Sequence, residues 1–270
     1  MGNVCAYCGK AGKLTKEHLY PQFLNRYMGT RFLGYNEAAD KVTVGERVIR
    51  DVCFTCNNES LGALDGYGHQ YFQANKLEQV FTEEKVTEVL YDYDLLLRWV
   101  LKISYNSFRT VDFSDDPFVS LLPYILTGKN RPKPKFVKLL IEVIRGHKLT
   151  DDERPRFSPR LQKTGYLPCH ILCSGRVMNC TPAIPCHLRH FQLNAHRFTL
   201  CLFPYSTRSA QSDHVVRIFR RQFPFAVTLN QDSTKMPIRI SRRDIVEIHA
   251  GPAVYPWQRF REQQYDAEHP

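Results

Sequence analysis

Two cysteine pairs near the start of the chain have the residue types and spacing of a metal site. Two residues separate Cys5 from Cys8, and two separate Cys53 from Cys56. Four thiolates form the closed tetrahedral set that structural zinc prefers, and such sites contribute roughly 10–16 kcal/mol to folding. Disulfides are not expected, because no secretory signal precedes Cys5. We therefore predict a structural Zn²⁺ site; the alternative is four unrelated thiols.

Polar side chains lie between and directly after these pairs. Glu17 and His18 lie between them, and Asn57 follows Cys56. A neutral imidazole is suited to accept a proton from water near neutral pH. A hard cation such as Mg²⁺ prefers oxygen ligands, and it would stabilise the charge that develops during phosphodiester hydrolysis. The residues predict a hydrolytic metal site; the alternatives are an exposed charged turn at Glu17-His18 and a helix N-cap at Asn57.

The segment between the cysteine pairs must position these groups. Its 44 residues exceed the spacer of a simple zinc ribbon. Residues 41–44 and 47–52 are rich in strand formers and flank Gly45, which predicts a hairpin. Leucines at helical spacing in residues 57–65 predict a helix. Because adjacent strand residues face opposite sides, Glu17 and His18 can serve one site only if the backbone bends there, and we expect such a loop.

The arrangement resembles the HNH endonuclease family, whose core is a ββα-metal (treble-clef) fold. The resemblance covers roughly residues 1–70, about a quarter of the chain. It rests on Cys5/Cys8, Glu17-His18-x-x-Pro21 and Cys53-x-x-Cys56-Asn57. The resemblance implies that His18 is the general base and that Glu17 and Asn57 bind a catalytic divalent metal, Mg²⁺ or another. It also implies that the four cysteines hold a separate structural zinc.

Two positions depart from the family pattern. The family often has aspartate where this chain has Glu17, and its middle asparagine has no match in residues 47–52. Asn58 or a backbone carbonyl is a candidate for the role of that asparagine, which is to orient the base.

The resemblance implies a metal-dependent endonuclease that acts on DNA and leaves 5′-phosphate and 3′-hydroxyl ends. One such site cuts one strand, so double-strand cleavage would require a homodimer or two events. The alternatives are an RNA nuclease and a zinc-dependent nucleic-acid-binding module without catalysis. Similar cores serve in restriction, phage defence and mobile elements, and a fold does not select among such roles.

The charge of the chain is compatible with a nucleic-acid partner. Its 37 Lys and Arg outnumber 27 Asp and Glu, giving a formal charge of +10 and a pI near 9.2. Such a surface attracts phosphates, although a basic protein without this function would look the same. Near the predicted site, Lys16, Arg47 and Arg50 are candidates for phosphate contacts. Residues 217–221 and 239–243 predict strands whose arginines face solvent or a DNA backbone.

The remaining sequence predicts an α+β protein with three regions. These are a nuclease module (1–70), a mainly helical region with a basic linker at 129–135 (71–156) and a β-rich accessory region of unknown role (157–270). Within residues 75–108, Asp94 is predicted to cap a helix with a buried stripe of Leu96, Trp99, Val100 and Ile103.

Composition also bears on compartment and on a second metal. No apolar run approaches the length of a membrane span, so we expect no membrane partner. The number of unpaired cysteines favours a reducing, cytoplasmic setting. A second metal site would have to be built from the cluster Cys169, Cys173, Cys180 and Cys186. Its spacing is irregular, and buried free thiols are the preferred interpretation.

Overall fold

The computed structural model describes ten segments of the chain. They are residues 4–28, 33–36, 41–44, 48–82, 86–110, 116–156, 163, 165–167, 171–181 and 184–244, of which 28, 33–36, 41–44, 156, 167, 171–181 and 184 are described by their backbone alone. The fold is mixed α+β, as predicted. None of the described helices combines the length and the apolar character that crossing a membrane requires.

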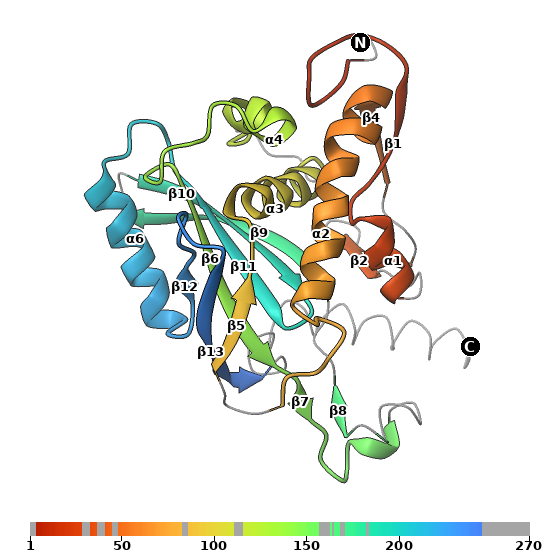
Figure 1. The fold of residues 1–270 in the computed structure, drawn as a ribbon, viewed down its shortest axis with the longest axis vertical. Coiled ribbons are helices and arrows are strands. Elements are labelled where there is room, and N and C mark those ends of the chain that lie inside the picture. The colour runs from red at the N-terminus through yellow and green to blue at the C-terminus, as the bar shows by residue number, and fades with distance from the viewer. Residues whose placement is uncertain are drawn as a thin grey trace.

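A seven-stranded sheet forms the centre of the molecule (Figure 1). Its strands are β5 (Val86–Leu90), β6 (Val137–Arg145), β9 (Ile171–Thr181), β10 (Ile184–Leu193), β11 (His196–Leu202), β12 (Val227–Thr228) and β13 (Lys235–Asp244). Six strands follow the order β5-β13-β6-β11-β10-β9, and β12 pairs with β6. β13 runs parallel to β6, and the other described pairings in this sheet are antiparallel.

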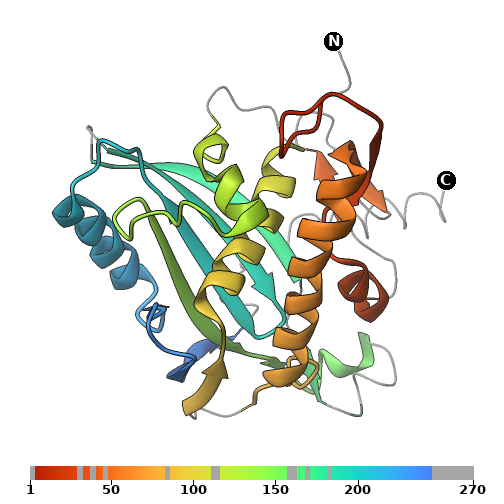
Figure 2. The ribbon, with the colours of Figure 1, turned by 45° about the horizontal axis from the view of Figure 1, so that its top comes forward.

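Helices cover both faces of this sheet (Figure 2). On one face, Trp99 of α3 (Tyr93–Phe108) contacts Phe191 of β10, with ring centroids 5.4 Å apart. On the other, Phe219 of α6 (Ser209–Gln222) stacks on His190 at 6.1 Å. Because His190 and Phe191 are neighbours in one strand, their side chains point to opposite faces. α3 and α6 therefore lie on opposite sides of the sheet.

The N-terminal module, here residues 4–74, lies beside α3 on the first face (Figure 1). It contains β1 (Leu14–His18), α1 (Gln22–Met28), β2 (Leu33–Asn36), β3 (Lys41–Val44), β4 (Val48–Cys53), a π-helical turn η2 (Cys56–Leu61) and α2 (Gly62–Ala74). β1 pairs antiparallel with β4, and η2 continues directly into α2. The two strands and the helix thus form one unit, with α1, β2 and β3 inserted between the strands.

The sequence predicted a hairpin between residues 41–44 and 47–52, and this pairing is wrong. Residues 41–44 form β3, which pairs with β2, whereas β4 pairs with β1. The predicted loop at Glu17-His18 is also wrong, because both residues belong to β1, but the register of β1 against β4 shifts between Thr15 and Glu17. Patterning indicates which segments are extended, but the choice of partner depends on packing between segments. The turn at Gly45 lies outside the described residues.

The helix predicted within residues 75–108 is present as α3, but β5 precedes it. Its N-cap is Asp92 rather than Asp94: a carboxylate oxygen of Asp92 accepts a hydrogen bond from the Leu95 N–H at 2.9 Å. Asp94 instead accepts a hydrogen bond from the Tyr124 hydroxyl at 2.6 Å. The predicted stripe is buried as expected, at Leu96, Trp99, Val100 and Ile103.

Of the two arginine-rich stretches, one was predicted correctly. Residues 239–243 belong to strand β13, but residues 217–221 belong to helix α6. Val215, Val216 and Phe219 are buried at helical spacing. A run of five residues that mixes basic and apolar side chains fits both the helical and the strand period. The sequence pattern therefore did not discriminate between a helix and a strand.

The sheet contains strands from two of the predicted regions. β5 and β6 come from residues 71–156, and they pair with β13 and β11 from residues 157–270. The division of the chain at residue 157 remains a prediction.

Candidate functional site

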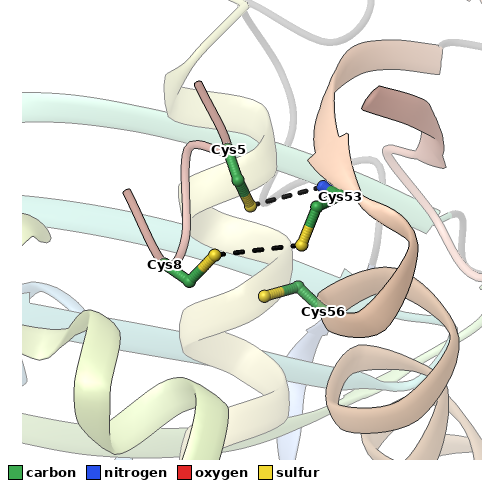
Figure 3. Close-up of side chains that lie close together, drawn as sticks. All are labelled: Cys5, Cys8, Cys53 and Cys56. Carbon is green, nitrogen blue, oxygen red and sulfur yellow. Dashed lines mark hydrogen bonds between the residues drawn. The ribbon is translucent and has the colours of Figure 1, made fainter. Parts of the chain in front are cut away.

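The four cysteines of the two pairs come together at one end of the N-terminal module (Figure 3). Their sulfur atoms all lie within 4.8 Å of one another, and the Sγ atoms of Cys8 and Cys53 are 3.8 Å apart. In a tetrahedral site with Zn–S bonds of about 2.3 Å, sulfurs are separated by about 3.8 Å. The cluster could therefore bind a zinc ion. Its members are Cys5, Cys8, Cys53 and Cys56, as predicted.

Local backbone geometry explains why these thiols converge. After Cys8 the chain turns through Gly9, whose φ of +70° favours glycine, and the Gly9 N–H donates to the Cys5 carbonyl at 2.9 Å. Cys53 ends β4 and Cys56 begins η2, so the second pair spans the junction of strand and helix. Each pair is thus fixed by a tight local turn.

The surroundings of Cys5 favour ionisation of its thiol. Burial alone would raise the pKa of Cys5, but backbone N–H groups directed at its sulfur outweigh this and lower the pKa to about 7. One of these donors is the Cys53 N–H, 3.3 Å from the sulfur. Burial raises the pKa values of Cys8 and Cys56. Because the thiolate is the form that binds metal, these two thiols depend on the cation's own charge to lose their protons.

Glu17 points away from solvent and into an ion pair with α3. Lys102 is fully buried, and its Nζ lies 2.8 Å from Glu17 Oε1 and 2.6 Å from Asp65 Oδ2. Burial alone would lower the pKa of Lys102, but the two carboxylates raise it above its usual value. Burial raises the pKa of Asp65, against the opposing effect of Lys102. With Asp65 ionised, the three groups together carry one negative charge.

Asn106 is a residue that the sequence analysis missed. Its buried amide nitrogen donates to Glu17 Oε1 at 3.0 Å and to the His18 carbonyl at 3.2 Å. Its amide oxygen accepts from the Tyr7 hydroxyl at 2.7 Å and from Arg109 at 3.1 Å. The amide is therefore held from both ends, and it fixes the backbone of the acid–histidine pair. No sequence signal marks Asn106, because it lies 89 residues from Glu17.

Arg109 connects the same helix to the other strand of the module. Its guanidinium contacts both carboxylate oxygens of Asp51 in β4, at 2.9 and 3.2 Å. It also lies over the rings of Tyr7 and Tyr105, at 4.9 and 4.2 Å from their centroids. The Tyr105 hydroxyl donates to the Ala6 carbonyl between the first two cysteines. α3 thus contacts the first cysteine pair, β1 and β4.

His18 lies at the end of β1, next to the first helix. It is less buried than Glu17, as strand alternation requires. Its Nε2 is 3.2 Å from the side-chain nitrogen of Gln22, the first residue of α1. An amide nitrogen can only donate, so in this contact His18 Nε2 is the acceptor.

Asn57 contacts the strand that carries the acid–histidine pair. Its amide nitrogen donates to the Lys16 carbonyl at 2.8 Å and to the Thr15 hydroxyl at 2.9 Å. Asn57 also lies in η2, and π-helical turns are frequent at functional sites. The structure therefore brings Asn57 to β1, although the contacts of its side chain differ from those of Glu17, which faces α3.

The other predicted residues fall into three groups. Lys16 and Arg50 are exposed on the paired strands β1 and β4, whereas Arg47 lies outside the described residues. The Asn58 amide donates to the Phe54 carbonyl at 3.1 Å. Of the cysteines considered for a second metal, Cys186 is buried in the sheet core. The side chains of Cys169, Cys173 and Cys180 lie outside the described part of the chain.

Comparison with known proteins adds no assignment. No protein-family model matches the chain, and neither a curated protein nor a solved structure matches it.

Proposed function

We propose that this protein is a metal-dependent endonuclease of the HNH type, with DNA as substrate. The observation that carries the proposal is the position of Asn57. It directly follows a cysteine of the metal-binding cluster, and its side chain is hydrogen-bonded to the strand that ends in Glu17-His18. A zinc ion at the four thiolates would fix this junction. The cluster would thus serve to hold an imidazole and oxygen donors in one small unit.

In this proposal His18 accepts the proton of the attacking water. The lone pair on its Nε2 faces the Gln22 amide in the structure, and water replacing that amide would meet the same acceptor. A Mg²⁺ or similar cation, when bound, would stabilise negative charge on the phosphate and on the departing oxygen. Lys16 and Arg50, exposed on the adjacent strands, would contact flanking phosphates.

The ligands assigned to the catalytic cation are Asn57 and Glu17. Asn57 already uses its amide nitrogen in contacts to β1, which leaves its oxygen for the cation. Lys102 and Asn106 both contact Oε1 of Glu17, so the cation would bind the other carboxylate oxygen, Oε2.

A nucleic-acid-binding module without catalysis is the competing function. In that case the cysteine cluster and the polar contacts to α3 would serve stability alone. The burial of Glu17 against Lys102 favours this alternative, because an interior ion pair accounts for the carboxylate without a second metal.

Cleavage by the zinc-loaded protein separates these functions. Supercoiled plasmid and a folded RNA are incubated with Mg²⁺ or Mn²⁺, and with metal-depleted buffer in place of a chelator, because a chelator would also remove zinc. We expect nicking of the plasmid that requires the added cation, and at least a 100-fold lower rate for His18→Ala. His69→Ala is the matched control, since His69 is an exposed histidine of the same module.

Three outcomes would contradict the proposal or redirect it. Equal rates for His18→Ala and His69→Ala would remove His18 from the chemistry. Binding of DNA without cleavage in any divalent metal would favour the binding module. Cleavage of RNA in preference to DNA would reassign the substrate.

A further inference from the structure

The two arginine-rich stretches, far from the metal-binding cluster, meet on the surface of the molecule. Arg217, Arg220 and Arg221 lie in α6, and Arg239, Arg242 and Arg243 lie in β13, and all six are exposed. The Arg243 guanidinium lies 3.5 Å from the Gln222 carbonyl at the end of α6. In Figure 1 the lower end of α6 lies toward β13, with β12 between the two elements. We call these six residues the arginine surface.

The fold directs these side chains outward from both elements. In α6, Arg220 and Arg221 lie three and four residues after Arg217, so the three share one face of the helix. The opposite face, with Val215 and Phe219, is buried against the sheet. The helix therefore presents its arginines to solvent in a fixed orientation.

The strand contributes in the same way. Ile238 and Ile240 of β13 are buried, and Arg239 between them is exposed. From Arg239 to Arg243 the strand spans about 13 Å at its usual rise. Together with the last turn of α6, the arginine surface is long enough for several phosphates of one backbone.

Neighbouring acidic groups are engaged by other partners. Asp213 of α6 pairs with Lys138 at 2.5 Å, and Asp244 of β13 pairs with His147 at 2.7 Å. Glu142 forms a buried ion pair with Arg197 beneath α6. Asp213 and Glu142 thus form ion pairs with cations outside the arginine surface.

Helix stability explains only part of this surface. Arginines in the last turn of a helix interact favourably with its dipole, which accounts for Arg220 and Arg221. Arg243 of β13 shares that effect, because its guanidinium reaches the Gln222 carbonyl at the end of α6, but the effect does not account for Arg239. Planar guanidinium groups, unlike lysine, form paired hydrogen bonds with phosphate oxygens.

We propose that the arginine surface binds the sugar–phosphate backbone of a nucleic acid. The inference rests on the proposed function, because the nucleic acid bound here would be the substrate whose phosphodiester bond is cut at the N-terminal module. α6 lies on the opposite face of the sheet from α3, so the arginine surface would hold a part of the nucleic acid remote from the bond that is cut.

Binding rather than cleavage tests this proposal. The zinc-loaded His18→Ala protein is titrated with labelled duplex DNA, single-stranded DNA and RNA over a range of salt. The triple variant Arg217→Ala/Arg220→Ala/Arg221→Ala is compared with Lys129→Ala/Lys133→Ala/Lys148→Ala, which removes the same charge from exposed residues elsewhere. Each lost phosphate contact lowers the slope of log K against log salt by about 0.9 for duplex DNA. For the arginine variant we expect the slope of log K against log salt to be smaller in magnitude by roughly 2 to 3. Its affinity at 0.1 M salt should be at least tenfold lower than that of the parent protein.

The outcomes distinguish this proposal from the nuclease proposal. Equal losses for the arginine and lysine variants would overturn it, and so would arginine-dependent binding to phosphatidylserine vesicles without binding to nucleic acid. The nucleic acid with the larger arginine-dependent loss identifies the backbone. Arginine-dependent binding by a protein that never cleaves would keep this inference and end the nuclease proposal. Cleavage by the wild type, together with unchanged nucleic-acid binding by the arginine variant, would keep the nuclease proposal and end this inference.

Discussion

The two ends of the N-terminal module differ in what holds them in place. The cysteine cluster is built by the module's own turns, one around Gly9 and one at the junction of β4 with η2. The Glu17-His18 pair is held from outside, by Lys102 and Asn106 of α3. Each cysteine pair is shaped by residues close in sequence, although the two pairs lie about 45 positions apart and α3 also contacts the first of them. Glu17 depends on α3 contacts that span about 85–90 positions. The Glu17-His18 pair therefore depends on α3 for its position.

The two faces of strand β1 also differ in their surroundings. The Glu17 side chain faces the protein interior and is surrounded by charged partners, whereas Lys16 on the other face is exposed. We expect changes on the inner face to reduce stability and changes at His18 to reduce chemistry.

The largest effect is expected from loss of a cysteine ligand. Cys53→Ala removes one of four thiolates, and structural zinc contributes on the order of 10 kcal/mol to the folding of small modules. The module should unfold and the bound zinc should fall from one equivalent toward zero, as measured by elemental analysis and circular dichroism. Cys201→Ala, in the sheet core, is the control. Full zinc content in Cys53→Ala would show that the cluster is not a metal site.

Removal of the buried ammonium should be the next largest effect. Lys102→Met leaves Glu17 and Asp65 without their cationic partner, and breaking a buried ion pair in this way costs about 3–5 kcal/mol. Denaturant unfolding would measure the loss, and adding Glu17→Gln and Asp65→Asn should recover part of it. If Lys102→Met costs no more than the surface change Lys129→Met, α3 does not hold the module through this ion pair.

The close approach of α2 and α3 gives a matched pair of glycine variants. A Cβ at Gly68 would lie 2.2 Å from the Trp99 ring, whereas one at Gly66 would meet nothing within 4 Å. Gly68→Ala should therefore cost about 2–3 kcal/mol through overpacking, and Gly66→Ala should add up to about 1 kcal/mol of helix stability. Thermal unfolding of both proteins measures the difference. Equal melting temperatures would mean that the two helices do not pack as closely as described.

The contact between the module and the sheet should depend on pH. His196 of β11 is buried against Tyr71 of α2, 2.6 Å from its hydroxyl, and burial lowers its pKa to about 3. The unfolded chain takes up a proton near pH 6.5 and the folded protein does not, so stability is full above that pH and is lost as the pH falls toward 3. The loss amounts to about 2 kcal/mol at pH 5.

A variant that cannot titrate isolates this effect. His196→Gln should show a shallower fall in unfolding free energy between pH 6.5 and 4 than the wild type, by nearly one proton. His214→Gln, at an exposed position of α6, should follow the wild type. Parallel curves for all three proteins would show that His196 is not kept neutral by the fold.

The sequence alone predicted that the four cysteines come together, because Cys-x-x-Cys spacing is a local signal. The burial of the α3 stripe was also predicted correctly, because helical spacing of apolar residues is a local signal too. The pairing of β3 and the helical state of residues 217–221 were wrong, since short segments take their partners and period from tertiary packing. Lys102 and Asn106 could not be predicted, because nothing in their local sequence marks a contact with Glu17.

Chemical rescue of a histidine variant tests the central claim most directly. His18→Ala is assayed for plasmid nicking with Mg²⁺, at full zinc content, with and without added imidazole. We predict that free imidazole restores a measurable part of the lost rate in His18→Ala but not in Asn57→Ala, because only the first lacks a proton acceptor. Cleavage by His18→Ala at the wild-type rate, without imidazole, would contradict the account.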